Sequence, residues 1–426
     1  MTATTPALVS YGNAITAMKA LPATNPLSWA YQAAIHGTTL SGSFPGWRTC
    51  EHGSLEFLSW HRMYLYWFER IIRKQSGDPN FALPFWNYEL ASERHLPPPF
   101  GAAGTGLHVP DADRGSGWNA GTSFLQASTV STAGCLPQLA FNSFSGNLEG
   151  TPHAAVHIAF GSTGGWMGSV STAAQDPIFY LHHCNIDRIW NAWLAQGGGR
   201  SNPLTDSTWK TKKFVFFDEN AKQVTMTGCD ILRAQEQLNY TYAGEPPQVK
   251  QYCPRRWPWW INVYEILLKL PPIKWPPGPD PGPIEIDIRR LRDRLTKTLG
   301  KDTEFALQLT DVTADRQPNV YWEIYFGLPK EERATSESPH YIGNLALFGG
   351  GVRGPEGHGA AHGAAFAFRI DEALKASLSQ ENQGPVLLQF VARGAGTNEP
   401  KELRSNASVN IGNAVISVRR SQEKKD

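Results

Sequence analysis

Six histidines in the first half of the chain have the residue type and spacing that could bind metal ions. His153 and His157 are four residues apart in the segment "TPHAAVHIAFG", so on a helix both imidazoles lie on one face. The other four lie within or beside segments with helical patterns: His36, His52, His61 and His183. These imidazoles could supply two sets of three nitrogen ligands, and nitrogen ligation without nearby carboxylates favours copper or zinc. Two such metals brought together could bind a small bridging molecule.

The alternative for each histidine is a structural role. A single histidine on an apolar helix is more often a hydrogen-bonded core residue than a ligand, and an H-x-x-x-H spacing alone is a weak signal. The pair His182 and His183 poses this choice most sharply. Adjacent residues on a helix point about 100° apart. This predicts that only one of the two faces the pocket, and helical geometry leaves open which one.

Four helical segments must position these residues. The segment 25–37 starts with Asn25 as the expected N-cap, and 55–79 is a strongly apolar segment that ends in basic residues. The segments 151–161 and 176–199 both begin with a capping residue followed by proline. Four core-facing helices predict a helical bundle, and the interior of such a bundle commonly holds metal sites.

The remaining segments have other patterns. Residues 91–148 are rich in Gly, Pro, Ser and Thr and are expected to form long surface loops. The range 251–283 is rich in proline and predicts a semi-rigid linker. Short runs of β-branched and aromatic residues then predict an all-β sandwich over 284–426. The expected architecture is therefore a mainly α domain over 1–250, a linker, and a C-terminal β-sandwich domain.

Composition limits the class of protein. The chain has 426 residues and a formal net charge of +1, which gives no electrostatic reason to expect nucleic acid or an anionic membrane as a partner. No apolar run is long enough to cross a bilayer, and the N-terminus lacks a signal-peptide pattern. The five cysteines have no paired spacing and indicate neither a disulfide framework nor a zinc finger. The default expectation is a reduced, cytoplasmic protein, with secretion left open.

The two longest motifs resemble those of a known family. "HGSLEFLSWHRMYLYWFE" (52–69) and "DPIFYLHHCNID" (176–187) are similar, in this order, to the two copper-binding signatures of the tyrosinase, catechol oxidase and haemocyanin superfamily. The motif "YTY" (240–242) resembles the tyrosine motif that closes the catalytic domain of polyphenol oxidases. The β-rich tail resembles their C-terminal shielding domain.

The resemblance implies two copper ions that use dioxygen to oxidise small phenols. Carried over position by position, it assigns three histidines to each copper: His36, His52 and His61 to the first, and His153, His157 and His183 to the second. In the family signature, the ligand is the second histidine of the HH pair. This selects His183 and leaves His182 as a supporting or packing residue.

A cysteine beside one expected ligand also matches part of the family. Cys50 lies two residues before His52. In fungal-type relatives this spacing carries a thioether between sulfur and imidazole, which would fix the orientation of the ring as other outer contacts of metal ligands do. The alternative is a small buried hydrophobic residue.

Three further positions acquire candidate roles from the resemblance. Glu149 matches a glutamate that holds a water in plant-type enzymes, although the helix dipole alone favours a carboxylate at a helix start. Ala154 stands where many efficient tyrosinases carry an asparagine that orients this water, so weak monophenol hydroxylation is expected. Val170 stands where plant catechol oxidases have a bulky phenylalanine. The smaller side chain predicts either an open entrance for bulky phenols or a loop residue without a role.

Residues between the motifs are expected to support the site. Phe179 and Trp190 share a helical face with His183 and could wall the pocket. Charged residues on otherwise apolar helices are expected to form cross-helix ion pairs: Arg62, Glu69, Asp187 and Arg188.

The activity implied by the resemblance is oxidation of o-diphenols to o-quinones, together with hydroxylation of monophenols. The C-terminal domain could cover the entrance and hold the enzyme latent. The alternatives are a strict catechol oxidase, an o-aminophenol oxidase, a haemocyanin-like oxygen carrier, and a zinc-only or copper-storage protein.

Overall fold

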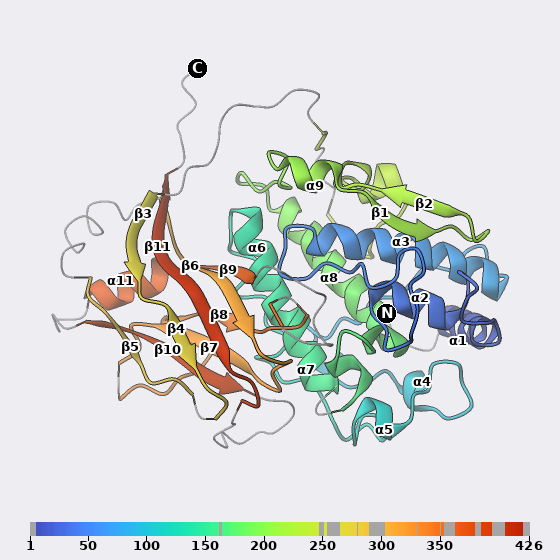
Figure 1. Cartoon of the computed structure of the whole chain (residues 1–426), viewed down its shortest axis with the longest axis horizontal. Helices are drawn as coiled ribbons and strands as arrows, with labels where there is room; N and C mark the ends of the chain where they lie inside the picture. Colours follow the sequence, from blue (N-terminus) through green and yellow to red (C-terminus); the bar gives the residue numbers. More distant parts are fainter. Residues whose placement is uncertain are drawn as a thin grey trace.

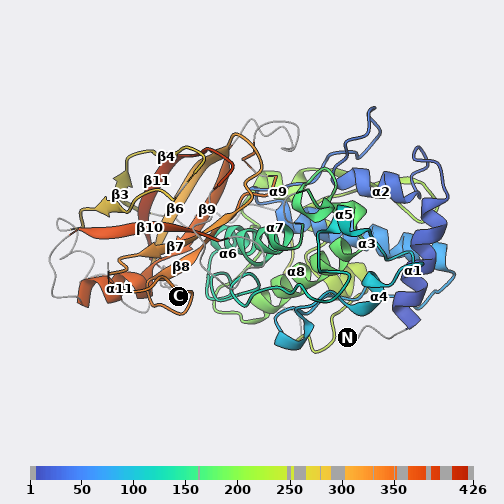
Figure 2. The same ribbon diagram turned by 90° about the horizontal axis from the view of Figure 1, so that it is seen from below.

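The computed structural model describes residues 6–161, 164–246, 251–253, 265–278, 280–288, 303–329, 331–349, 351–352, 363–379, 385–393 and 405–420. A helical part and a β-rich part lie side by side, each with its own hydrophobic core (Figures 1 and 2). This confirms the predicted fold class of a helical domain followed by a C-terminal β domain. Within the described ranges, every helix is too short or too polar to span a bilayer.

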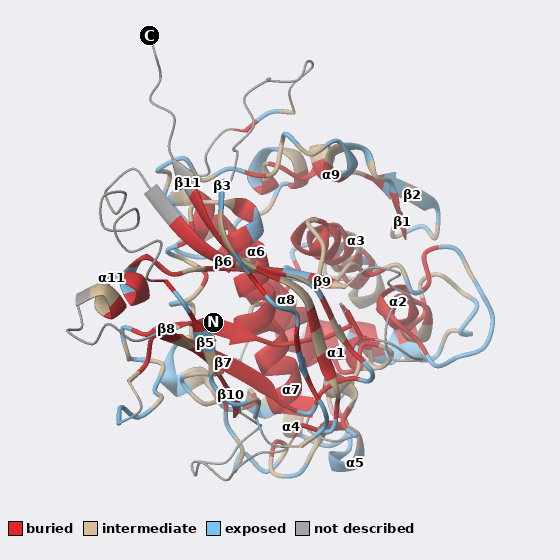
Figure 3. Cartoon of the chain, turned by 60° about the vertical axis from the view of Figure 1, so that its left-hand side comes forward, coloured by how far each residue is buried: buried red, intermediate tan, exposed pale blue. Residues whose placement is uncertain are grey.

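Four helices at the centre of the helical part carry most of the histidines. They are α2 (Trp29–His36), α3 (Phe57–Ser76), α7 (Ala155–Gly161) and α8 (Ile178–Ala195). Figure 3 shows that α3, α7 and α8 are largely buried. Around them lie α1 (Pro6–Lys19), η1 (Ala91–Glu93), α4 (Pro98–Gly101), α5 (Asp111–Arg114), α9 (Ser207–Thr211), η5 (Gly228–Asp230), η6 (Ala234–Leu238) and a hairpin of β1 (Phe214–Phe217) with β2 (Gln223–Met226).

The helix ends agree only partly with the expected ones. Helix α3 ends at Gly77, which adopts the left-handed φ of 71° expected of a C-terminal glycine. The expected start of α2 at Asn25 is wrong. Ser28 is the cap, because its Oγ accepts a hydrogen bond from the backbone N–H of Tyr31 at 3.1 Å. Asn25 instead accepts from the N–H of Leu27 in the preceding turn.

A helix also lies inside the range 91–148 that was expected to be loop. Helix α6 (Phe141–Leu148) continues through a π-helical segment, η2 (Glu149–Ala154), into α7. The chain kinks at Thr151, whose φ and ψ are −148° and 128°, so the regular helix expected from residue 151 begins only at Ala155. The apolar side chains of α6 are buried, and the helix packs against the β-rich part, a long-range contact that gives no local signal.

The β-rich part contains two antiparallel sheets. One has the order β5 (Ile284–Ile286), β10 (Val386–Arg393), β7 (Tyr321–Phe326) and β8 (Tyr341–Leu345). The other has the order β3 (Glu265–Leu270), β11 (Val409–Arg420), β6 (Thr303–Ala314) and β9 (Ala364–Arg369), with β4 (Ile273–Trp275) also paired to β11. Helix α11 (Asp371–Ser379) follows β9. Strands β3 and β4 fall inside the range 251–283, so part of the proline-rich segment is strand.

The contact between the two parts is close and partly polar. Asn147 of α6 donates from Nδ2 to the carbonyl of Ala367 at 2.6 Å, and Asn344 of β8 donates to Oγ1 of Thr151. A Cβ atom on Gly150 would lie 2.7 Å from the carbonyl oxygen of Asn344. The two backbones therefore lie so close here that position 150 has no room for a side chain larger than hydrogen.

One pair of cysteines forms a disulfide, which corrects the expectation from cysteine spacing. Cys229 and Cys253 are joined across 24 residues, at the end of the helical part. Their separation in the sequence matches no common motif, so the pairing depends on the fold. Cys50, Cys135 and Cys184 are buried and unpaired in the described structure.

A buried ion pair joins α3 to α8. Nε of Arg62 lies 2.6 Å from Oδ1 of Asp187, and the two side chains are 0% and 3% exposed. This confirms a cross-helix pair for these two residues. The same expectation is wrong for Glu69, which pairs with Arg73 of its own helix, and Arg188 pairs with Glu89 in a loop.

Replacing Asp187 with alanine should strongly destabilise the helical part, because Arg62 would remain buried without a counter-charge. Removing one partner of such a pair typically lowers the free energy of unfolding by about 3–5 kcal/mol. Urea denaturation followed by tryptophan fluorescence would measure this. As a matched control, Lys375→Ala removes a partner from the exposed Lys375–Glu372 pair and should change stability by less than about 1 kcal/mol. Equal effects of the two substitutions would contradict the assigned role of Asp187.

Candidate metal centre

One cluster of imidazoles lies between α2 and the start of α3. His36 is the last residue of α2, His61 is in the first turns of α3, and His52 is in the loop that precedes α3. One ligand nitrogen from each of the three lies within 4.8 Å of the others. His36 and His61 are buried, and His52 is half-buried. The structure therefore brings together the three residues expected to bind the first metal.

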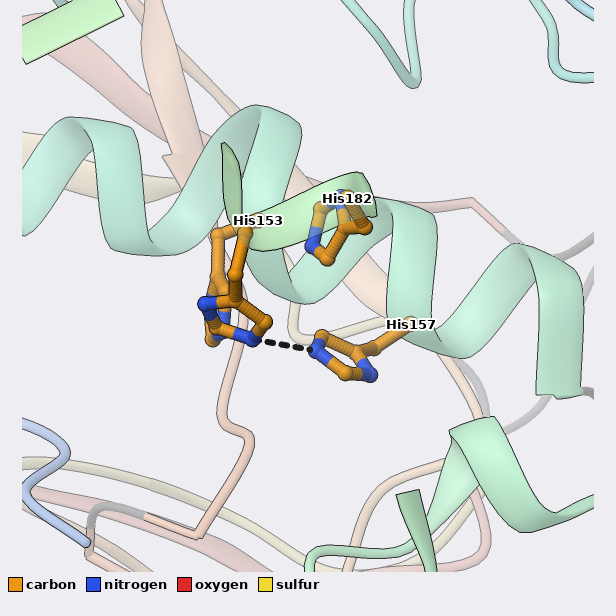
Figure 4. Close-up of side chains that lie close together, drawn as sticks. His153, His157 and His182 are labelled. Carbon is orange, nitrogen blue, oxygen red and sulfur yellow. Dashed lines mark hydrogen bonds between the residues drawn. The ribbon is translucent and has the colours of Figure 1, made fainter. Parts of the chain in front are cut away.

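A second cluster lies between η2, α7 and α8. It contains the three residues expected to bind the second metal, His153, His157 and His183, and also His182, all buried and within the same 4.8 Å limit. Figure 4 shows His153, His157 and His182 grouped around a common space. Nε2 of His157 lies 3.4 Å from Nε2 of His183.

The expectation that His182 and His183 could not both face one pocket is wrong. Their ring centroids lie 5.1 Å apart, and both rings contact His153 and His157. Adjacent side chains on a helix point in different directions. Here His153 of η2 and His157 of α7 lie between His182 and His183, so all four imidazoles face one space. Tyr88 contacts Nδ1 of His182 at 3.0 Å through its hydroxyl, which leaves Nε2 of His182 directed away from Tyr88.

The two clusters face each other directly. The rings of His61 and His183 stack with centroids 4.3 Å apart and planes 5° apart, and His52 stacks on His153 at 5.6 Å. The two sets of possible metal ligands therefore lie on opposite sides of one small space.

Backbone carbonyls fix the orientation of the rings. Nδ1 lies at hydrogen-bond distance from a carbonyl oxygen in four of them: His36 with Val170 (3.0 Å), His61 with Phe57 (2.8 Å), His153 with Glu149 (3.1 Å) and His157 with Met167 (2.8 Å). A carbonyl can only accept, so Nδ1 carries the proton and Nε2 is the nitrogen able to bind a metal. Such outer contacts are typical of metal-binding histidines.

The electrostatics of the second cluster keep its imidazoles neutral, which is the form that binds metals. Burial lowers the pKa of His157 to about 3, and burial together with the neighbouring histidines lowers the pKa of His153, His182 and His183 well below the usual range.

Several nitrogens of this cluster also lack another use. Nε2 of His153, Nε2 of His182 and Nδ1 of His183 are buried and have no hydrogen-bond partner among the described residues. Buried polar atoms are nearly always paired, and each orphan is costly. A metal ion held by the second cluster would use Nε2 of His153, so this orphan nitrogen fits the copper ions that the sequence motifs imply.

Cys50 is placed beside the imidazole that it was expected to modify. Its Sγ lies 3.5 Å from Nδ1 of His52, and the residue is buried. The structure thus brings the two groups into contact, and the thioether itself stays a prediction.

Glu149 and Ala154 lie at the edge of the second cluster, and both are buried. The carboxylate of Glu149 accepts a hydrogen bond from the backbone N–H of Gly53 at 2.6 Å, beside His52. Burial raises the pKa of Glu149 to about 8. The side chain of Glu149 thus lies beside the loop that carries His52, and its backbone carbonyl contacts His153 of the second cluster, while its role in holding a water stays a prediction.

Val170 is a loop residue with two contacts that bear on the site. Its carbonyl orients His36, and its side chain is buried under the β-rich part. A Cβ atom on Gly349 would lie 2.7 Å from Cγ2 of Val170 and 3.1 Å from Nδ1 of His52. The β-rich part therefore covers this side of the histidine clusters in the full chain.

Phe179 is in the expected place and Trp190 is not. Phe179 contacts His183 at 4.2 Å and His36 at 4.7 Å between ring centroids, so it walls the site. Trp190 lies instead against the guanidinium of Arg62, whose carbon is 3.7 Å from the centroid of the indole ring.

Phe348 is a site residue that the sequence did not reveal. It follows β8 in the β-rich part, yet its ring stacks on His157 with centroids 4.1 Å apart and planes 17° apart. It also lies edge-on to His52 at 5.7 Å and to His153 at 5.8 Å. Only 2% of the residue is exposed. The sequence Phe-Gly-Gly after a predicted strand gives no local sign of such a contact.

Comparisons with known proteins agree with this geometry. The family model described as the common central domain of tyrosinase matches residues 26–134 and 112–196, and the polyphenol oxidase middle domain matches 203–256. Tyrosinase HcTyr1 of Hahella sp. (strain CCB-MM4) is 34% identical over 289 residues, which is 54% of this chain and 59% of the relative. The latent chloroplastic polyphenol oxidase of Prunus armeniaca is 32% identical over 276 residues, 55% of this chain and 46% of the relative. The chain thus spans about half the length of these curated relatives.

Two solved structures share the fold over almost the whole chain. The recombinant latent aurone synthase, a polyphenol oxidase, has a TM-score of 0.68 and 21% identity, and the match covers 99% of this chain and 89% of that one. Latent apple tyrosinase has a TM-score of 0.65 and 22% identity, and the match covers 98% of this chain and 96% of that one. The helical core with a C-terminal antiparallel β domain is therefore an established arrangement.

The two adjacent histidines of α8 should respond differently to substitution. His183→Ala is expected to abolish copper binding at the second cluster, because it removes an expected ligand whose ring stacks on His61 of the first cluster. His182→Ala should weaken binding there without emptying the site. The measurement is copper bound per chain after dialysis, with His340→Ala, a buried histidine of the β-rich part, as the control. Loss of copper from His182→Ala and retention by His183→Ala would reverse the assignment.

Proposed function

This chain belongs to the family of tyrosinases and polyphenol oxidases, and we propose that it is a copper-dependent oxidoreductase that uses dioxygen to convert o-diphenols into o-quinones. The observation that carries the proposal is the pair of facing histidine clusters, whose rings stack at 4.3 Å. Two copper ions are proposed, the first held by His36, His52 and His61, and the second by His153, His157 and His183. When bound, they supply the chemistry that reduces dioxygen while two electrons and two protons leave each catechol.

The protein residues bind and orient the phenol in this proposal. The position of Phe348 marks where an aromatic ring is accommodated, face to face with His157. A phenol in the same place would have its ring fixed by His157. The surrounding wall excludes water, since Phe179 and Val170 are buried. Glu149 is proposed to hold a water at the clusters, and Ala154 provides no amide to orient that water, so hydroxylation of monophenols is proposed to be weak.

The β-rich part is proposed to hold the enzyme in a latent state. Phe348 occupies the position proposed for the substrate ring, and Gly349 lies against His52 and Val170. Hydrogen bonds from Asn147 to Ala367 and from Asn344 to Thr151 hold this part in place beside the clusters. A phenol therefore competes with a residue of the same chain, and an intramolecular competitor is present at a high effective concentration.

The activity is tested by adding a catechol to the copper-loaded chain in air, and recording both quinone absorbance and dioxygen uptake. We expect both signals, and we expect dopamine to be oxidised much faster than tyramine is hydroxylated. A chain with His61→Ala should show neither signal. Reversible uptake of dioxygen without any quinone would instead identify an oxygen carrier, and equal rates on dopamine and tyramine would refute the role of Ala154.

Replacing Phe348 with alanine should activate the full chain. An aromatic pair contributes about 0.5–1.5 kcal/mol beyond its buried area, so its loss should raise kcat/KM for a catechol by about 2- to 10-fold. Phe124→Ala, at an exposed position outside the site, is the matched control and should leave kcat/KM unchanged. Unchanged activity of a folded, copper-loaded Phe348→Ala chain would argue against the shielding role.

A further inference from the structure

One short loop contacts an imidazole in each of the two clusters. The loop Trp166–Thr172 joins α7 to α8 and includes η3 (Trp166–Gly168), and it is followed by η4 (Ala173–Gln175). The carbonyl of Met167 lies 2.8 Å from Nδ1 of His157, and that of Val170 lies 3.0 Å from Nδ1 of His36. His61 and His153 also contact a carbonyl oxygen through Nδ1, but each of these carbonyls belongs to the residue four positions earlier in the same segment, so no loop is needed to supply it.

We propose that the loop Trp166–Thr172 is a shared positioning element that orients one ligand of each metal. The inference rests on the proposed function for the identity of the metal. An imidazole binds a metal more tightly when its other nitrogen is hydrogen-bonded, because that contact fixes both the tautomer and the ring orientation. For His36 and His157, the loop supplies this contact through the carbonyls of Val170 and Met167.

The loop is held as one unit by its own hydrogen bonds. The hydroxyl of Thr172 donates to the carbonyl of Trp166 at 2.9 Å, which closes the loop end to end. The N–H of Ser169 donates to the carbonyl of Trp166 at 3.2 Å, and the N–H of Thr172 donates to the carbonyl of Ser169 at 3.1 Å. A displacement of one carbonyl is therefore transmitted to the other, three residues away.

Two glycines let the loop approach the helices that carry the ligands. A Cβ atom on Gly37, which follows His36, would lie 2.4 Å from the carbonyl oxygen of Val170. A Cβ atom on Gly161, the last residue of α7, would lie 1.9 Å from the N of Gly168 and 2.6 Å from the carbonyl carbon of Met167. Gly37 has an extended backbone with φ −169° and Gly161 is helical, so alanine is otherwise permitted at both positions. The glycines are required by the approach of the loop and not by their own conformations.

Three substitutions test the proposal on the full chain. Gly37→Ala presses on the Val170 carbonyl, Gly161→Ala presses on the Met167 carbonyl, and Thr172→Val removes the hydroxyl that closes the loop without adding bulk. Gly12→Ala in α1 is the matched control, because its Cβ would make only ordinary contacts, with Cγ of Leu107 at 3.6 Å and with the backbone N of Gly106 at 3.7 Å. Copper affinity is measured by competition with a chromophoric chelator, and folding of the metal-free chains is checked by circular dichroism.

We expect each of the three loop variants to lose about 10- to 100-fold in copper affinity, the usual effect of changing an outer contact of a metal ligand. Gly12→Ala should bind copper like the unmodified chain. Folded Gly37→Ala and Thr172→Val chains with unchanged affinity would overturn the positioning role, and Thr172→Val decides alone if the two bulkier variants do not fold. If the unmodified chain itself binds no copper, the proposed function fails instead, so the two failures are distinguishable.

Discussion

The arrangement of the metal centre depends on the distance between two helices, and a buried ion pair sets that distance. Arg62 directly follows His61 on α3, and Asp187 lies one turn beyond His183 on α8. The contact between Nε of Arg62 and Oδ1 of Asp187 therefore holds the two helices together next to the place where the rings of His61 and His183 stack. A buried charge pair is directional and tolerates little displacement, unlike apolar packing.

The rest of the ion-pair network fixes both partners. Tyr240 and Tyr242 donate to Oδ2 of Asp187 at 2.5 Å and 2.7 Å, and Asn191 and the carbonyl of Ile231 accept from Arg62 at 2.6 Å and 3.2 Å. All the charged atoms are thus satisfied, which a buried pair needs to offset its desolvation. The YTY motif marked the end of the helical part in the sequence. In the structure, its two tyrosine hydroxyls hold the carboxylate of Asp187 on α8.

The features that could be predicted from the sequence are local ones. The end of α3 at Gly77 and the strands β6 to β11 follow from glycine, β-branched and aromatic patterns within a few residues. The six histidines were assigned as ligands through the resemblance of their motifs, and the structure brings them into two facing clusters, while their role as ligands stays a prediction. Phe348 and the inclusion of His182 were missed because each depends on contacts between segments far apart in the chain. The Cys229–Cys253 pair and the burial of α6 against β9 have the same origin.

If the chain were cleaved, the disulfide would determine which parts remain covalently joined. It closes a loop that contains Ile231, Tyr240 and Tyr242, the residues after α9 that hold the ion pair, and it ends at the last described residue before the β-rich part. Cross-linking a loop of this length removes roughly 3 kcal/mol of unfolded-state entropy in the chain-entropy picture. A peptide bond cut beyond Cys253 would therefore free the β-rich part, together with Phe348, from covalent attachment. Tyr240 and Tyr242, which hold Asp187, would stay attached to the helical part. The β-rich part that covers the site could therefore be removed separately from the residues that position it.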